Sequence, residues 1–146
     1  MRVALALGLM SLALLLPASA AAGDGFPWRE RASSYGHLSV TFVVDRIVVG
    51  PRGWSAVLEM HNWDIDLALH DDFALLVDGR RVLPATRARP PLPVRLGVRA
   101  AWRGTISGTR RPPHGSTVRL RLGTFRAEIA PNLILRHVTR HVYRVP

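Results

Sequence analysis

Residues 95–106, Arg-Leu-Gly-Val-Arg-Ala-Ala-Trp-Arg-Gly-Thr-Ile, decide the fold class because apolar and polar residues alternate along them. The apolar positions are Leu96, Val98, Ala100, Trp102 and Ile106. The polar positions are Arg95, Arg99, Arg103 and Thr105. Successive side chains of a strand point to opposite faces of a sheet. Arg95–Ile106 therefore predicts one strand with one face on a core and the other in solvent.

Other segments show the same alternation or a β-branched composition and are expected to be strands. They are Leu38–Val44, Ile47–Val49, Trp54–Met60, Leu67–Leu69, Phe73–Val77, Arg80–Leu83 and Val118–Leu122. Between them lie turn residues. Gly50-Pro51-Arg52-Gly53 joins the second and third of these segments, and Asp78-Gly79 predicts a type I′ hairpin turn. The pattern predicts an antiparallel all-β protein.

Three segments interrupt the alternation. Pro84–Pro93 contains four prolines and is expected to cross between sheets or edges without forming a ladder. At Gly123 the apolar set slips by one position, which predicts a β-bulge or a turn. Leu133–Val145 fits a helical stripe, but its Val, Thr, Tyr and Ile content favours a strand, which we expect.

The order of these features resembles a known family. A strand ending at Asn62, the run Phe73–Gly79, the proline-rich crossing, Trp102–Ile106 and Val118–Leu122 are similar to bacterial extracytoplasmic immunoglobulin-like domains of unknown function, of the small secreted mycobacterial antigen type. The resemblance spans Leu38–Phe125. It implies an immunoglobulin-like antiparallel β-sandwich of about seven strands. The chain has no cysteine, so we expect no disulfide.

The chain divides into three expected parts. Residues 1–20 read as a signal peptide, with a charged start, a short apolar core and a cleavage site after Ala20 or Ala22. Residues 21–36 lack periodicity and are expected to be a flexible N-terminal segment. Residues 37–146 form the sandwich with a basic C-terminal segment. We therefore expect a secreted or periplasmic protein that does not span the membrane once it is processed.

The charge indicates the class of partner. The formal net charge is +10, and every one of the 20 basic residues is arginine. Such a balance favours an anionic envelope polymer or a membrane surface, and with a secretory signal no nucleic-acid partner is expected. The candidate binding residues are the outward arginines of two strands: Arg95, Arg99, Arg103, Arg119 and Arg121. They share one surface if both strands lie in one sheet.

Two other kinds of function are weighed against this one. The region His61–Asp72 holds His61, His70, Asp64, Asp66, Asp71 and Asp72, which would supply ligands to a metal-dependent hydrolase, but their spacing matches no metal-binding loop. His137 and His141 would supply half of a metal site, among arginines that repel a cation. No serine lies in a nucleophile-elbow motif. We therefore predict no enzyme, no metal site and no cofactor, and a protein-protein module using a sheet edge is the alternative.

Overall fold

The computed structural model describes residues 25–34 and 38–146. Within them the chain forms antiparallel strands and no helix, so this part holds no helical segment long and apolar enough to cross a membrane. The signal peptide expected at residues 1–20, with its cleavage site, lies outside the described residues. The antiparallel all-β architecture predicted from the sequence is confirmed.

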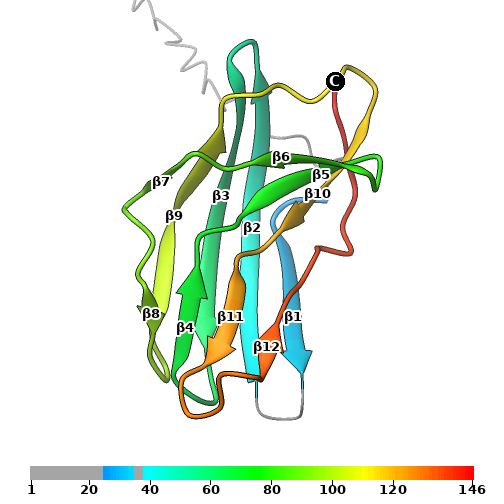
Figure 1. The fold of residues 1–146 in the computed structure, drawn as a ribbon. Helices are drawn as coiled ribbons and strands as arrows, with labels where there is room; N and C mark the ends of the chain where they lie inside the picture. Colours follow the sequence, from blue (N-terminus) through cyan, green and yellow to red (C-terminus); the bar gives the residue numbers. More distant parts are fainter. Residues whose placement is uncertain (1–24, 35–37) are drawn as a thin grey trace, which may run out of the picture.

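The first layer is a five-stranded sheet in the order β1-β2-β3-β9-β7 (Figure 1). Its strands are β1 (Trp28–Ser34), β2 (Leu38–Gly50), β3 (Gly53–Asn62), β9 (Ala101–Gly108) and β7 (Arg87–Arg89). The hairpin of β2 and β3 is its centre, with Gly50 opposite Gly53 across the predicted turn. The two expected segments Leu38–Val44 and Ile47–Val49 form the single strand β2, with a β-bulge between Val44 and Arg46 that keeps both Val44 and Ile47 buried.

The second layer consists of two four-stranded sheets, one above the other in Figure 1. The chain passes from strands of one sheet directly into strands of the other. One has the order β13-β10-β5-β6, with β13 (Tyr143–Arg144), β10 (Thr117–Arg121), β5 (Ala74–Val77) and β6 (Arg81–Pro84). The other has the order β12-β11-β4-β8, with β12 (Ile134–Leu135), β11 (Thr124–Ala127), β4 (Leu67–His70) and β8 (Arg95–Leu96). Thirteen strands in the described residues replace the seven or so expected, because two predicted strands, Arg95–Ile106 and 133–145, are each divided and because β1, β7 and β11 were not predicted.

The core lies between the two layers, and alternation along each strand produces it. β2 and β3 contribute the inward residues Val40, Phe42, Val44, Ala56, Leu58 and Met60 from the first layer. The second layer contributes Leu67, Leu69, Leu75, Val77, Val118, Leu120 and Phe125. These residues belong to one cluster that includes Trp102 and Ile106 of β9. With no cysteine in the chain, this apolar burial is the main source of stability.

The predicted Asp78-Gly79 turn is confirmed. Asp78 and Gly79 have φ angles of 49° and 71°, the left-handed conformation that a type I′ turn requires at both positions. The loop has a third residue, Arg80, in addition to the two predicted turn residues. The N–H of Arg80 donates to the Val77 carbonyl, whereas the cross-strand partner of Val77 is Arg81. Residues 133–145 contain no helix, but the strand expected over this segment is present only as two short strands, β12 and β13, which belong to different sheets.

Three expectations require correction. Arg95–Ile106 is not one strand: β8 lies in the second layer, β9 lies in the first, and a turn at residues 97–100 joins them. Pro84–Pro93 does contain a ladder, because its proline-free residues form β7 against β9. The segment 21–36, expected to be flexible, contains β1, which pairs with β2 along its whole length.

Glu30 of β1 closes the seam between the two layers. It is only 8% exposed, and its carboxylate accepts hydrogen bonds from Trp28 Nε1 at 2.6 Å, His137 Nε2 at 2.6 Å and the backbone N–H of Arg140 at 3.0 Å. Burial alone would raise the pKa of Glu30, but these hydrogen bonds and the neighbouring His137 outweigh it and lower the pKa. We call Glu30, His137 and Arg140 the seam latch.

The slip predicted at Gly123 is the place where β10 passes into β11. A Cβ atom on Gly123 would lie 2.5 Å from the His70 carbonyl oxygen and 2.5 Å from the Phe73 ring. The two sheets of the second layer can therefore join there only if residue 123 has no side chain.

We expect Gly123→Ala to destabilise the protein by about 1–3 kcal/mol, because the backbone carbonyl of His70 must move to make room. Urea denaturation followed by tryptophan fluorescence measures the effect. The matched control is Gly50→Ala, since nothing lies within 4 Å of the position of its added Cβ. Equal midpoints for the two variants would show that the joint between the sheets is not tightly packed.

Candidate functional site

The structure does not bring the five predicted arginines together on one surface. Arg103 lies on the outer face of the first layer, whereas Arg119 and Arg121 lie on the outer face of the second, because the core separates their strands. Arg95 belongs to β8 at the edge of the second layer. Arg99 occupies the turn before β9 with a φ angle of 60°. The number of acidic side chains nearby therefore differs from one of these arginines to another.

Two of the predicted residues are neutralised by acids. Arg95 pairs with Asp66 at 2.7 Å and with Glu128 at 2.8 Å. The hydrogen bond to Glu128 and the charge of Asp66 raise the pKa of Arg95. Arg103 pairs with Asp45 at 3.3 Å and approaches Glu59 to 3.9 Å. Neither arginine offers an uncompensated charge to an anionic partner.

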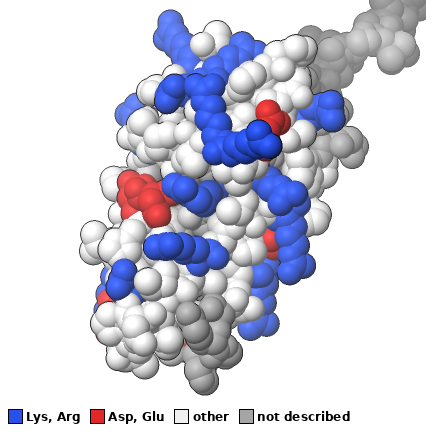
Figure 2. All heavy atoms as spheres, turned by 45° about the vertical axis from the view of Figure 1, so that its right-hand side comes forward, with Lys and Arg blue, Asp and Glu red and all other residues white. Residues whose placement is uncertain are grey.

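The second layer carries a larger group of arginines, which we call the basic strip. It comprises Arg119, Arg121, Arg126, Arg136 and Arg144. Arg119 and Arg121 alternate with buried residues of β10. Arg144 of β13 lies opposite Thr117 of β10. In the described part of the chain, none of the five has a carboxylate within 4.0 Å. Figure 2 shows basic side chains spread over this view of the molecule, with acidic atoms in one larger patch at the left and in a few small spots.

Two members of the basic strip are oriented by backbone carbonyls. Arg121 Nη2 donates to the Asp72 carbonyl at 3.2 Å, and Arg126 Nη1 donates to the Pro131 carbonyl at 2.7 Å. A carbonyl fixes the direction of the guanidinium without cancelling its charge. These arginines are therefore positioned in advance and remain cationic toward solvent.

Three arginines of the strip surround a hollow on this face, which we call the arginine hollow. It consists of two adjoining depressions of about 280 and 420 Å³ that share Asp72, Thr124 and Arg136. Arg121 lines the smaller depression and Arg126 the larger. The Nε atom of Arg121 is buried without a hydrogen-bond partner among the described residues.

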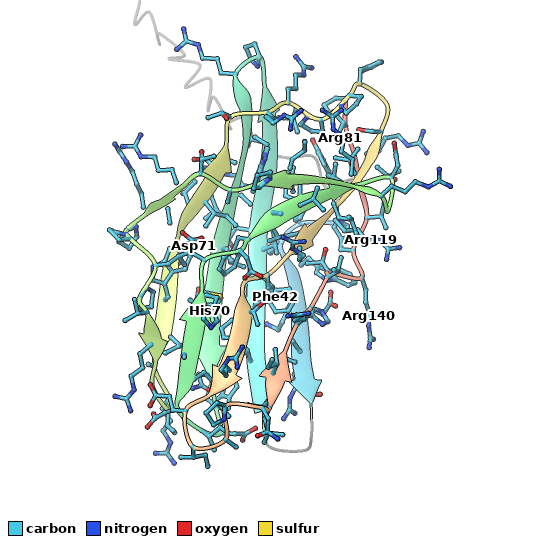
Figure 3. All side chains as sticks on the ribbon, viewed as in Figure 1. Phe42, His70, Asp71, Arg81, Arg119 and Arg140 are labelled. Atoms are coloured by element: carbon cyan, nitrogen blue, oxygen red, sulfur yellow. The ribbon has the colours of Figure 1, made fainter. Side chains whose placement is uncertain are left out.

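The acids beside the hollow are unequal. Both carboxylate oxygens of Asp72 are used at the start of β11, accepting from the backbone N–H of Thr124 at 2.6 Å and from its hydroxyl at 2.8 Å. His70 and Asp71, labelled in Figure 3, line the larger depression and do not line the smaller one, to which Arg121 belongs. The smaller depression therefore has two guanidinium groups, of Arg121 and Arg136, against the single carboxylate of Asp72.

The residues of the candidate hydrolase site are dispersed. Asp66 is engaged by Arg95 and by the backbone N–H of Val98, and Asp72 by Thr124. His61 lies on the outer face of the first layer, whereas His70 lies on the second. In residues 25–34 and 38–146, no three His, Asp or Glu side chains are grouped to hold a metal ion.

The two C-terminal histidines are structural neighbours of β1. His137 bonds to Glu30, and its ring meets Phe42 edge-on at 5.3 Å between centroids. His141 stacks on Trp28 at 5.0 Å and meets Phe26 edge-on at 4.8 Å. Both imidazoles are therefore packed against other rings and against the seam.

Sequence reasoning missed Arg126, Arg136 and Arg144. The signal was present, because Arg126 lies between the apolar residues Phe125 and Ala127 and Arg136 follows the buried Leu135.

No family model, no curated protein and no solved structure matches this chain.

Proposed function

We propose that the protein is an exported, non-enzymatic binding module whose basic strip contacts an anionic polymer or membrane surface of the cell envelope. The observation that carries this proposal is the convergence of Arg121, Arg126 and Arg136 at the arginine hollow, without ion-pair partners in the described chain. The expectation of export comes from residues 1–20.

The chemistry of the strip favours phosphate and carboxylate groups. A guanidinium is planar and presents parallel N–H donors that match two oxygens of such a group. Arg119 and Arg121 stand two residues apart on β10, so their Cα atoms are about 7 Å apart along the strand. A polymer that repeats its anionic groups along a chain can contact both arginines at once.

The proposed site differs from the predicted one in its residues. Arg119 and Arg121 remain in it. Arg95 and Arg103 leave it because acids neutralise them, and Arg99 leaves it because it lies in the turn between β8 and β9. Three arginines enter it because they share the outer face of the second layer, namely Arg126, Arg136 and Arg144.

Replacing Arg119, Arg121, Arg126 and Arg136 together by Gln is expected to weaken binding to anionic probes on the order of 30-fold or more, since each exposed charged contact contributes about 0.5–1 kcal/mol. The probes are long-chain inorganic polyphosphate and vesicles of phosphatidylglycerol, with phosphatidylcholine vesicles as the neutral comparison. Binding of the unaltered protein should weaken steeply from about 0.05 to 0.5 M NaCl.

The matched control removes the same charge from the first layer. Arg29, Arg46, Arg52 and Arg87 are exposed, and replacing all four by Gln lowers the net charge equally. We expect this control to lose no more than about threefold in affinity. Equal losses in the two quadruple variants would contradict the proposal, because binding would then depend on net charge and not on the basic strip.

A further inference from the structure

Trp63 is an exposed aromatic residue on the outer face of the first layer, opposite the basic strip. It follows the last residue of β3 and is 51% exposed. Beside it, His61 pairs with Thr41 across β2 and β3, and the next outward row contains Glu59 paired with Arg103. The row lies over β2, β3 and β9, which are neighbours in the sheet (Figure 1).

The indole of Trp63 is held in place although it is exposed. Its Nε1 donates to the Thr41 hydroxyl at 2.9 Å. Its ring stacks on His61, with 5.7 Å between centroids and 13° between planes, and His61 is in turn bonded to Glu59. A ring fixed in this way loses little conformational entropy when a ligand covers it.

The charged residues of the Glu59–Arg103 row compensate one another. Arg103 is compensated by Asp45 at 3.3 Å and by Glu59 at 3.9 Å. This row therefore offers no uncompensated charge, and the unpaired charge nearest to it on β1 is that of Arg31, which lies opposite Thr41 and has no carboxylate within 4.0 Å among the described residues. It still presents a carboxylate and a guanidinium, which accept and donate hydrogen bonds, within about 13 Å of the indole by the rise of a β-strand.

We propose that Trp63, with His61, Glu59 and Arg103, forms a platform that binds the sugar rings of a neutral polysaccharide. The C–H groups on one face of a pyranose carry partial positive charge and pack on the negative face of an indole. Its hydroxyl groups then bond to Glu59 and Arg103. A flat sheet face with one fixed ring suits an extended glycan chain, which lies along the surface.

This platform is independent of the proposed function, and salt separates the two. At 1 M NaCl the Debye length is about 3 Å, so contacts of the basic strip are screened, whereas stacking on an indole is retained. Binding is measured at about 1 M NaCl with insoluble cellulose, insoluble chitin and, in affinity gel electrophoresis, soluble xylan. We expect the unaltered protein to be retained by at least one of them.

Trp63→Ala is expected to reduce this retention by about tenfold, and Thr41→Val, which frees the indole N–H but keeps the ring, by a smaller factor. Val48→Ala is the matched control, because Val48 is an exposed apolar residue of β2 at 49% exposure, and it should bind like the unaltered protein. Circular dichroism checks that each variant is folded.

Three results would overturn the platform: no retention of the unaltered protein on any of the three glycans at high salt, full retention of folded Trp63→Ala, or the same loss in Val48→Ala. None of them would bear on polyphosphate binding at low salt. Conversely, failure of the basic-strip experiment would leave the glycan result unaffected.

Discussion

Asn62→Asp is expected to destabilise the protein by about 3–4 kcal/mol at neutral pH. Asn62 is 1% exposed. Its side-chain NH₂ group donates to three backbone carbonyls, those of Ile65 at 2.6 Å, Leu96 at 2.8 Å and Gly97 at 3.1 Å. The substitution places a buried carboxylate oxygen against carbonyl oxygens where an N–H donor stood.

A comparison with Asn62→Leu separates the cost of the lost N–H donor from the cost of the buried charge. Leucine also leaves the three carbonyls unsatisfied, but it introduces no charge, so its cost should be smaller, about 2–3 kcal/mol. The penalty of the Asp variant should decrease as the pH falls, because protonation removes the buried charge. Urea denaturation at about pH 7 and about pH 4 measures both effects. Asn132→Asp, at an exposed position, is the control.

If Asn62→Asp unfolds at the same urea concentration as Asn132→Asp, the contacts of Asn62 do not hold the turn between β8 and β9. The backbone of Asn62 also takes part in this turn, since its N–H bonds to the Ala100 carbonyl and its carbonyl accepts from the Arg99 N–H. The side-chain substitutions leave those two bonds in place. The measured difference therefore reports the side chain alone.

Glu30→Gln is expected to cost about 2–3 kcal/mol at neutral pH, because a buried carboxylate that accepts hydrogen bonds from three residues is replaced by a neutral amide. The NH₂ half of the amide cannot accept from these donors. The control is Glu128→Gln, which removes an exposed acid paired with Arg95 and should change stability little.

The dependence on pH follows from the direction of the shift. The pKa of Glu30 is lower in the folded protein than in the unfolded chain, so its contribution is fully present above the unfolded value of about 4.3. That contribution is lost as the pH falls through the lower, folded pKa. The unfolding free energies of the unaltered protein and of Glu30→Gln should therefore converge on acidification below about pH 4. A constant difference down to about pH 2 would contradict the assignment.

Alternation in the sequence predicted the long strands well and the layers poorly. Leu96 and Trp102 are both buried and in phase, which suggested one strand, yet they enter the core from different layers. A period of two reports whether a side chain points inward, and it carries no information about the layer from which it points. For this reason the sequence alone could not show whether the five predicted arginines lie on one surface.

The strand β1 was missed for a physical reason. Its inward positions are Trp28, Glu30 and Ala32, and a charged residue at the middle position hides the alternation. Glu30 is stable there only because His137 and Arg140 supply donors from the far end of the chain. A sequence pattern confined to one window cannot show a partner so distant.

The seam latch has a consequence for the order in which the molecule folds. Its contacts join residues that are 107 and 110 positions apart, among the longest sequence separations in the fold. Closing so long a loop costs more entropy than forming the β2–β3 hairpin, so the hairpin is expected to form early and the latch late. During synthesis, the carboxylate of Glu30 lacks these two partners until residue 140 has been added. We therefore expect the seam latch to be among the last contacts between the two layers to form.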